Sequence, residues 1–250
     1  MTDTHSRQPE LVWYLAYGSN MSSAKFTGGR GIVPLDTVRV RIPGWILAME
    51  IPGLPYSEPS FSSIVPRTCI EAVVEKCATP DLVGLAYLIT QDQYRHVLAS
   101  EGGGTAYRDI SVRGEALEAE DSQRIGHPIL LRTLATAMRR QPWPAPSRRY
   151  KDLLVQGGEE ARLPPKYQQY LSEMACYNPP DAQWTKIGAF IFTTMWGPVM
   201  AFLEWITGIS IQEDGNALPC VILLVRWTMF IIWASHDYLF APVFGRGDGL

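Results

Sequence analysis

Short segments in which apolar and polar side chains alternate fill the first part of the chain and predict a sheet. Residues 37–51 (TVRVRIPGWILAMEI) alternate on both sides of Pro43-Gly44, a pair that predicts a break or bulge in the strand. Residues 106–117 alternate in the same way, as a half-buried strand does. The other segments with strand character are 12–20, which ends in a turn, 127–136, and the pair 69–77 and 82–90, joined around Pro80-Asp81.

Helical patterns follow several of these strands. Residues 91–102 place their apolar side chains on one face of a helix. Residues 147–158 and 164–177 also predict helices, the second because Pro164-Pro165 suits the first turn of a helix. A region rich in strands followed by helices predicts an α+β fold, here a small, mixed, curled and barrel-like sheet with flanking helices.

The pattern changes near residue 187. Residues 1–186 hold 40 charged residues, 20 of each sign, whereas residues 187–250 hold seven and carry the whole net charge of -3. Residues 187–211 contain 16 apolar residues among 25, and residues 217–234 contain 15 among 18, with a polar turn at 212–216. We therefore expect two units, a mixed domain over 1–186 and a hydrophobic helical hairpin over 187–250.

Both apolar stretches of this tail are about long enough to cross a bilayer. Several features argue against membrane spanning. Each stretch contains one charged residue, Glu204 or Arg226, Pro198 interrupts the first stretch, and no cluster of Lys or Arg flanks either stretch. Two alternatives stay open. The hairpin packs on the main domain or on a second copy of the chain, or it contacts a membrane, where tryptophans are favoured at the interface. Either contact is expected through residues 187–234.

The overall composition narrows the class of protein. The chain has 250 residues, is 46% hydrophobic, and balances 22 basic against 25 acidic residues. That apolar content excludes a disordered chain, and the near-neutral charge argues against a nucleic-acid-binding protein. The N-terminal residues lack the pattern of a secretory signal, and the four cysteines (Cys69, Cys77, Cys176 and Cys220) form no CxxC pair. We therefore expect a cytoplasmic protein with reduced thiols.

The segment YLAYGSNM (14–21) is a candidate ligand site. A strand ends at Tyr17, and Gly18 lets a ligand approach the backbone because it has no Cβ. Ser19 and Asn20 are capping residues, so the amides near them can point at an anionic group such as a carboxylate. The same residues also suit an ordinary turn.

Glu101 is the candidate acid–base residue. It lies in SEGGGTAYRDISV (100–112), where a helix gives way to three glycines and then a strand. A carboxylate in an apolar pocket has a raised pKa and can act as both base and acid near neutral pH. A glutamate beside glycines is, on the other hand, commonly a solvated loop residue.

Other chemistries lack their sequence patterns. GGRG (28–31) lacks the GxxxxGK[ST] pattern of a phosphate loop and is expected to form an ordinary loop. Ser19 has no GxSxG elbow around it, which argues against a serine hydrolase. The histidines are scattered, at His5, His96, His127 and His236, and form no metal-binding pattern. We expect no metal and no cofactor.

Three motifs in a fixed order carry a family resemblance. They are YLAYGSNM (14–21), the run from VGLAYLIT to SEGGGTAY (83–107), and SRRYKDLLVQGGEEARLPPKYQQYLSEM (147–174). In this order they resemble the substrate loop, the catalytic glutamate segment and the later helices of the γ-glutamylcyclotransferase family, whose wider fold includes the AIG2-like proteins. The resemblance covers residues 12–178.

The resemblance implies roles for individual residues. Glu101 falls on the family's general acid–base glutamate, and Tyr150 falls on a pocket tyrosine that contacts substrate. The loop that binds the γ-glutamyl group corresponds to Tyr14, Leu15, Ala16, Tyr17, Gly18 and Ser19. Two features depart from the family pattern. Three glycines follow Glu101, and the chain has a hydrophobic tail that the short animal enzymes lack.

The implied reaction is a cyclisation of a small γ-glutamyl compound. Its α-amine attacks its own γ-carbonyl, which releases 5-oxoproline and the free amine without a metal or redox cofactor. Glu101 would take a proton from the α-ammonium group and return it to the leaving nitrogen, a double role that requires an apolar surrounding. Amides of the Tyr17–Asn20 turn would hold the α-carboxylate or the developing oxyanion.

The tail and residues 42–66 resemble the fungal branch of the family, which occurs in gene clusters for gliotoxin-type epidithiodiketopiperazine toxins. This likeness implies a glutathione-conjugated intermediate of secondary metabolism as the substrate. The alternatives are a housekeeping cyclotransferase that acts on glutathione or γ-glutamyl amines, a non-catalytic ligand-binding member of the fold, and a membrane-tethered adaptor.

Overall fold

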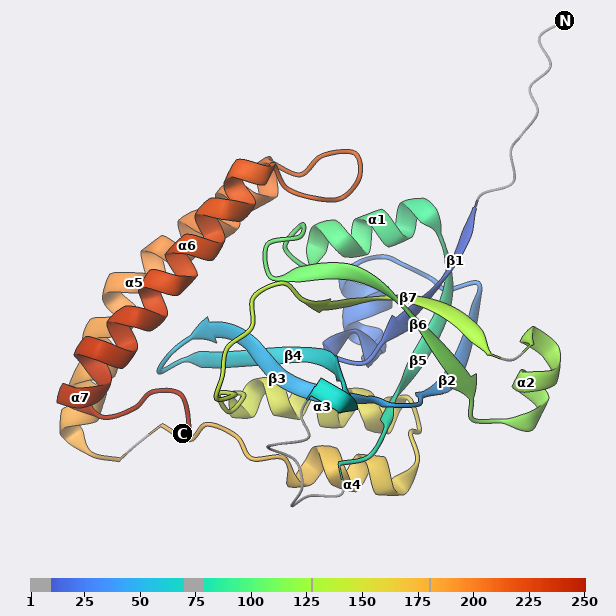
Figure 1. Cartoon of the computed structure of the whole chain (residues 1–250), viewed down its shortest axis with the longest axis horizontal. Helices are drawn as coiled ribbons and strands as arrows, with labels where there is room; N and C mark the ends of the chain where they lie inside the picture. The colour runs from blue at the N-terminus through green and yellow to red at the C-terminus, as the bar shows by residue number, and fades with distance from the viewer. Residues whose placement is uncertain (1–9, 70–78, 127, 180) are drawn as a thin grey trace, which may run out of the picture.

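A closed β-barrel forms the centre of the molecule (Figure 1). The computed structural model describes residues 10–69, 79–126, 128–179 and 181–250. Neighbouring strands pair antiparallel, and a parallel contact between the first and last strands closes the barrel. In spatial order the strands are β1 (Leu11–Ala16), β5 (Leu82–Thr90), β2 (Asp36–Ile42), β6 (Tyr107–Ala116) and β7 (Ile129–Thr136). The predicted α+β fold with a curled, barrel-like sheet is confirmed.

Pro43-Gly44 separates the barrel from a second sheet, as the sequence predicts. Gly44 has a φ of 74°, which favours glycine, and the chain turns there from β2 into β3 (Trp45–Leu54). β3 pairs antiparallel with β4 (Glu58–Pro66), and the register shifts between Ala48 and Ile51. The sequence pattern does not predict β4, because serines interrupt its apolar positions.

One predicted strand pairing cannot be placed. Of the segment 69–77, residues 70–77 lie outside the described residues. The strand expected to pair with it, β5, lies between β1 and β2 in the barrel.

The three helices predicted in the first part of the chain are present. α1 (Gln91–Ser100) begins with a capping box, and α3 (Arg148–Glu160) begins after Ser147, whose side chain accepts a backbone hydrogen bond. α4 (Pro165–Glu173) has proline in its first turn. Four short elements are not predicted by the sequence pattern: α2 (Ala119–Ile125), the 3-10 turns η1 (Ser19–Met21) and η3 (Arg67–Cys69), and the π-helical turn η2 (Ala24–Gly29).

The C-terminal residues form a long helical hairpin beside the barrel (Figure 1). α5 (Gln183–Ile209) begins slightly before the change in composition at residue 187, and Pro198 does not end it. After the polar turn, α6 (Pro219–Ser235) runs back along α5. The chain then continues through η4 (His236–Phe240) and α7 (Ala241–Phe244).

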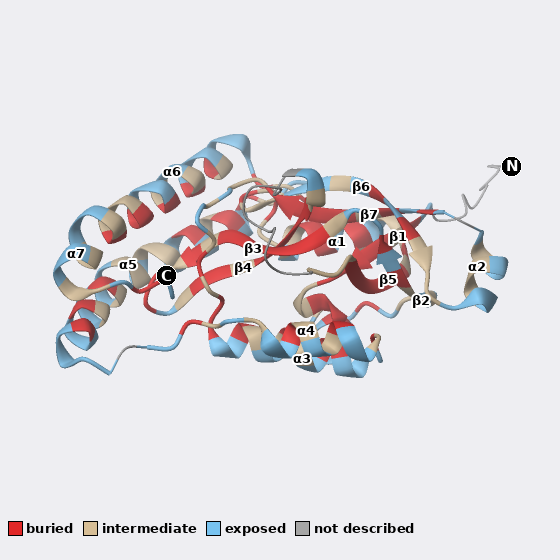
Figure 2. Cartoon of the chain, turned by 60° about the horizontal axis from the view of Figure 1, so that its bottom comes forward, coloured by how far each residue is buried: buried red, intermediate tan, exposed pale blue. Residues whose placement is uncertain are grey.

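The hairpin has a buried face and an exposed apolar face (Figure 2). Phe192, Leu203 and Ile232 pack inward with Tyr56, and the indole of Trp233 donates a 3.0 Å hydrogen bond to the backbone of Gly53. The hairpin therefore packs on the main domain, one of the two predicted alternatives. The exposed face carries large apolar side chains, among them Trp184, Phe190, Ile191, Phe202, Trp205, Trp227, Phe230 and Ile231. By length and composition alone, the helical segments Gln183–Ile209 and Pro219–Phe244 could cross a membrane.

Candidate active site

A cleft of about 740 Å³ lies between the barrel, the β3–β4 sheet and the helical hairpin. A smaller polar pocket adjoins it, and Ser19, Glu101, Tyr107 and Tyr150 line both. The residues around the small pocket are Tyr14, Tyr17, Gly18, Ser19, Asn20, Ser62, Glu101, Tyr107, Leu134 and Tyr150. The fold thus brings together Glu101, Tyr150 and most of the predicted substrate loop, which are far apart in the sequence.

Glu101 stands at the end of α1, where the helix gives way to the glycine run. The amide of Asn20 donates a 3.0 Å hydrogen bond to its Oε1, and the guanidinium of Arg30 forms an ion pair with the same oxygen. The other oxygen, Oε2, accepts no hydrogen bond from the part of the chain that the structure describes. The prediction that apolar side chains surround this carboxylate is therefore wrong, because the amide of Asn20 and the guanidinium of Arg30 bind it.

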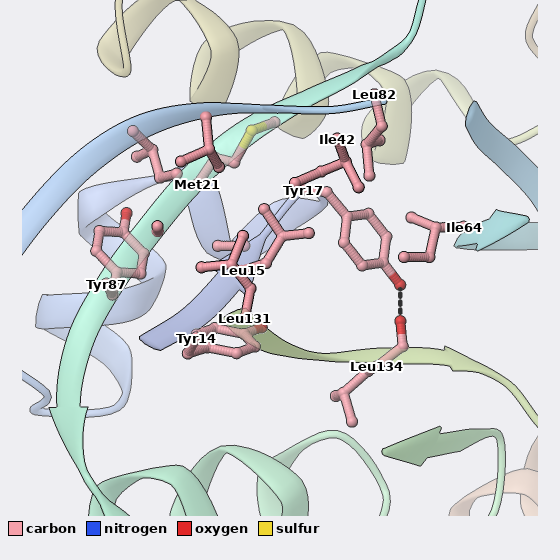
Figure 3. Packing of buried hydrophobic residues seen from close by; sticks show 14 of the residues in the cluster. Tyr14, Leu15, Tyr17, Met21, Ile42, Ile64, Leu82, Tyr87, Leu131 and Leu134 are labelled. Atoms are coloured by element: carbon pink, nitrogen blue, oxygen red, sulfur yellow. Dashed lines mark hydrogen bonds between the residues drawn. The ribbon is translucent and has the colours of Figure 1, made fainter. Parts of the chain in front are cut away.

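The predicted substrate loop begins on β1 and ends in η1. The hydroxyl of Tyr14 accepts a 2.8 Å hydrogen bond from Asn20, and the hydroxyl of Tyr17 donates to the backbone carbonyl of Leu134 (Figure 3). Burial raises the pKa of both phenols, so they remain neutral hydrogen-bonding groups near neutral pH. Asn20 thereby connects the loop to Glu101.

Leu15 and Ala16 occupy a different position from the rest of the loop. Both are fully buried in the barrel core (Figure 3 labels Leu15), and neither lines the pocket. Their predicted contact with substrate stays a prediction, and only their main chain could make it.

Gly18 is the point where the loop turns into the pocket. A Cβ at this position would lie 2.7 Å from Ser62 Oγ and 3.5 Å from the Tyr150 hydroxyl. The first N–H groups of a helical turn have no partner within it, so the start of η1 presents amides beside the pocket. Glycine suits this position because a Cβ would push the Ser62 side chain of β4 away from Tyr150.

Tyr150, in the first turn of α3, is held by Ser62 on β4. Its hydroxyl accepts a 3.2 Å hydrogen bond from the Ser62 backbone N–H and lies 2.7 Å from Ser62 Oγ. The Tyr107 hydroxyl donates a 3.2 Å hydrogen bond to the Ser62 carbonyl. Burial raises the pKa of Tyr150 to about 12, so this phenol is neutral near pH 7.

The glycine run after Glu101 has a defined geometry. Gly102, Gly103 and Gly104 have φ values of 85°, 52° and 81°, a region that other residues rarely occupy. The backbone N–H of Ala217 donates a 2.8 Å hydrogen bond to the Gly103 carbonyl. Arg226 of α6 donates to the carbonyls of Gly104 at 3.0 Å and of Thr105 at 3.1 Å. The helical hairpin therefore holds the segment that follows Glu101.

Sequence reasoning missed three residues of this site. Arg30 lies in the GGRG segment, which is expected to form an ordinary loop, yet Gly28 and Gly29 belong to η2 and Arg30 pairs with Glu101. Ser62 lies in the strand that was not predicted. Arg226 is the single charge of an apolar stretch, and such a charge is a sequence signal for a residue that binds a polar partner in the fold.

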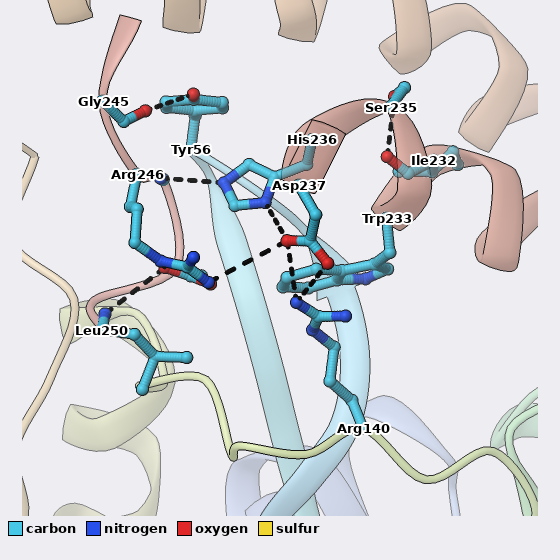
Figure 4. Close-up of polar contacts among 12 residues, drawn as sticks. Tyr56, Arg140, Ile232, Trp233, Ser235, His236, Asp237, Gly245, Arg246 and Leu250 are labelled. Atoms are coloured by element: carbon cyan, nitrogen blue, oxygen red, sulfur yellow. Dashed lines mark hydrogen bonds and ion pairs between the residues drawn. The ribbon is translucent and has the colours of Figure 1, made fainter. Parts of the chain in front are cut away.

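One group of side chains outside the cleft has the composition of a metal site. His236, Asp237 and Asp248 lie close together near the C-terminus, and Figure 4 labels His236 and Asp237 with their arginine partners Arg140 and Arg246. Asp237 pairs with Arg140 at 2.8 Å, and Asp248 forms an ion pair with Arg246. His236 Nδ1 lies 2.9 Å from Asp237 Oδ1, while its Nε2 accepts a backbone N–H at 3.0 Å. Through these partners the group fixes the C-terminal segment.

The sequence is similar to fungal proteins over nearly its whole length. It is 41% identical over 249 residues to "Gamma-glutamyl cyclotransferase aclK" of Aspergillus oryzae, with 96% of this chain and 91% of that protein covered. It is 31% identical over 245 residues to "Gamma-glutamyl cyclotransferase gliK" of Aspergillus fumigatus, with 95% and 89% covered. Residues 182–243, which include the helical hairpin, match the family model for the AclK C-terminal domain.

Solved structures are similar to about two thirds of this chain or slightly more. A protein described as "Gamma-glutamyl cyclotransferase" superposes with a TM-score of 0.51 at 18% identity, over 70% of this chain and 92% of that one. YkqA from Bacillus subtilis superposes with a TM-score of 0.50 at 18% identity, over 68% and 57%. At this identity the likeness shows a common fold.

Proposed function

The chain belongs to the γ-glutamyl cyclotransferase family, as its similarity to the aclK and gliK proteins shows, and on that basis we propose that it releases 5-oxoproline from a glutathione-conjugated small molecule. The observation that carries this proposal is the position of Glu101. Its carboxylate faces the pocket formed by the Tyr14–Ser19 loop and Tyr150. No metal or redox cofactor is needed for this reaction.

Although Arg30 and Asn20 rather than apolar groups surround its carboxylate, Glu101 acts as the general base and then as the general acid, because it holds the proton only between the two steps. Asn20 and Arg30 hold Oε1, so Oε2 is directed to the substrate, where it takes a proton from the α-ammonium group. The freed α-amine attacks the γ-carbonyl carbon, forming the ring C–N bond. Glu101 then returns this proton to the amide nitrogen as the original γ C–N bond breaks. The ring nitrogen sheds a second proton as it becomes an amide, and Glu101 passes that proton to the departing amine, which leaves as an ammonium group, so no water is consumed.

The remaining pocket residues hold the γ-glutamyl group in a reactive conformation. Because nucleophile and electrophile belong to one molecule, the main task is to keep them in attack geometry. The amides around Gly18 and Ser19 bind the α-carboxylate or the oxyanion, and the phenols of Tyr17 and Tyr150 border the same space. Residues 1–186 thus form the catalytic domain, and residues 187–250 form a helical extension of it.

The identity of the products tests this proposal. Purified full-length protein is incubated with glutathione, γ-glutamyl amino acids, γ-glutamyl-lysine and a bis-glutathionylated diketopiperazine, and the products are separated by mass. Reactions in ¹⁸O-labelled water separate cyclisation from hydrolysis. We expect unlabelled 5-oxoproline and the free amine in equal amounts, with the diketopiperazine conjugate preferred. Labelled glutamate would identify a hydrolase, and binding without any product would identify a non-catalytic member of the fold.

A further inference from the structure

The C-terminal hairpin forms one wall of the active-site cleft. The cleft runs from Glu101 to the inner face of the hairpin, so a substrate whose γ-glutamyl group lies beside Glu101 extends its leaving group toward α5 and α6. Besides Glu204, the hairpin residues on the cleft are Met200, Leu203, Thr207 and Gly208 of α5, and Val225 and Met229 of α6.

This wall differs chemically from the catalytic end. It consists mainly of aliphatic and thioether side chains, and methionine adapts to irregular apolar shapes. Glu204 is the one charge that the hairpin contributes to the cleft. The basic residues on the cleft are Lys25, Arg30 and Arg149, which come from other elements; Arg30 pairs with Glu101, and Arg149 lies 2.7 Å from Glu58.

From this arrangement we propose that the hairpin is the leaving-group subsite, and that it selects γ-glutamyl compounds whose leaving amine carries a bulky apolar body. The proposal rests on the cyclotransferase activity proposed above. The leaving dipeptide ends in a carboxylate with or without an attached group, and the hairpin wall offers it no cationic partner, so the preference depends on the attached body. An apolar body joined to that dipeptide buries its surface against the methionine, leucine and valine side chains.

The wall is fixed to the catalytic domain from both ends of the hairpin. Near the turn, Ala217 and Arg226 bond to the segment that follows Glu101. At the other end, Trp233 bonds to β3, and Asp237 pairs with Arg140. A wall held in this way is preorganised, and preorganisation favours selection by shape.

Two glycines of α5 provide a matched test. Gly208 lines the cleft, Gly197 does not, and a Cβ added at either position meets no atom within 4 Å outside its own stretch of helix. Both positions therefore have space for a larger side chain, and because Gly197 precedes Pro198, whose ring restricts the residue before it, circular dichroism must show that each phenylalanine variant keeps the fold. At position 208 the phenylalanine projects into the leaving-group subsite.

The experiment measures kcat/KM for glutathione and S-benzylglutathione in the full-length protein and in the Gly208→Phe and Gly197→Phe variants. We expect the wild type to favour S-benzylglutathione by about tenfold or more. Gly208→Phe lowers this preference at least about tenfold, whereas Gly197→Phe retains it. Equal kcat/KM for the two substrates in the wild type, or equal changes in both variants, would overturn the proposal.

A binding measurement separates this proposal from the catalytic one. Calorimetry with the Glu101→Gln protein determines the affinity for both compounds without turnover. Tighter binding of S-benzylglutathione that Gly208→Phe abolishes supports the subsite, even if the wild type releases no 5-oxoproline. Equal affinity for the two compounds contradicts the subsite, even if 5-oxoproline is released.

Discussion

Replacing Tyr150 by phenylalanine tests how the pocket is held together. The register shift in the β3–β4 sheet pairs Phe61 and Ser63 with β3 but leaves Ser62 between them unpaired in the ladder. The Ser62 N–H and hydroxyl instead meet the Tyr150 hydroxyl, at 3.2 and 2.7 Å. All three groups are buried, so the phenylalanine variant leaves two polar groups of Ser62 without this partner.

The expected loss of stability follows from those contacts. A net hydrogen bond contributes about 1 kcal/mol, and an unsatisfied buried donor costs roughly 1–3 kcal/mol. Tyr150→Phe should therefore lower the free energy of unfolding by about 2–4 kcal/mol. The aromatic contact with Phe61, with ring centroids 5.1 Å apart, is retained.

Ser62→Ala is the matched control. It removes only the hydroxyl and keeps the N–H donor to Tyr150, so we expect a loss of about 1 kcal/mol. Urea unfolding of both single variants and of the double variant gives the coupling between the two residues, expected near 1 kcal/mol. A Tyr150→Phe loss no larger than that of Ser62→Ala would refute this account of the pocket.

Three further predictions concern the site and its supports. Gly18→Ala should lower kcat/KM by about tenfold to hundredfold with an unchanged circular dichroism spectrum, because the new Cβ displaces Ser62; unchanged kinetics would contradict the close approach. Arg226→Gln should lower the free energy of unfolding by about 1.5–3 kcal/mol in urea unfolding, because it removes charge-assisted hydrogen bonds to Gly104 and Thr105; Arg226→Lys should recover part of the loss. Burial lowers the pKa of His236 in the folded protein. As the pH drops below about 6.5, the unfolded chain binds a proton at His236 before the folded protein does, so the free energy of unfolding decreases until the pH reaches the lower pKa of the folded state. Urea unfolding between pH 8 and 5 should show a weaker fall in His236→Asn, and an identical pH dependence would show that His236 does not contribute.

Local sequence signals were sufficient for much of the fold. Alternation predicted β6, and the break at Pro43-Gly44 correctly separated β2 from β3. Each of these features depends on residues close together in the chain, which a pattern of apolar positions or a turn-forming pair can reveal. β4 escaped prediction because its serines face Tyr150 and the backbone of neighbouring segments rather than solvent.

The site could be predicted only in part, because some of its contacts join residues that are far apart in the chain. Glu101 and the loop at Tyr14–Ser19 belong to recognisable motifs. Glu101 lines the pocket, and so do the loop residues other than Leu15 and Ala16. The ion pair between Glu101 and Arg30 joins residues 71 positions apart, and nothing in GGRG indicates it. The environment of a carboxylate depends on such distant partners, which is why the expected apolar surrounding was wrong.

The hydrophobic tail shows what composition leaves undecided. A helix that is apolar on all sides can meet protein, lipid or a second copy of the chain. The structure assigns one face of the hairpin to the catalytic domain and leaves the other exposed. Met200 and Met229 lie well inside their helices and face the cleft, so a hairpin that spanned a bilayer would carry the cleft into the hydrocarbon. Contact of the outer face with a membrane surface or with a second copy of the chain is compatible with this packing.

The central claim is that Glu101 transfers the proton that allows the α-amine to attack. The most direct test is the rate of 5-oxoproline release by the Glu101→Gln variant, compared with the wild type on the best γ-glutamyl substrate under saturation. Glutamine keeps the size of the side chain and its contact with Asn20 but cannot accept the proton. We predict a fall in kcat of about 10²–10⁴, with unchanged circular dichroism and retained substrate binding. A folded Glu101→Gln protein with near-wild-type turnover would contradict the account.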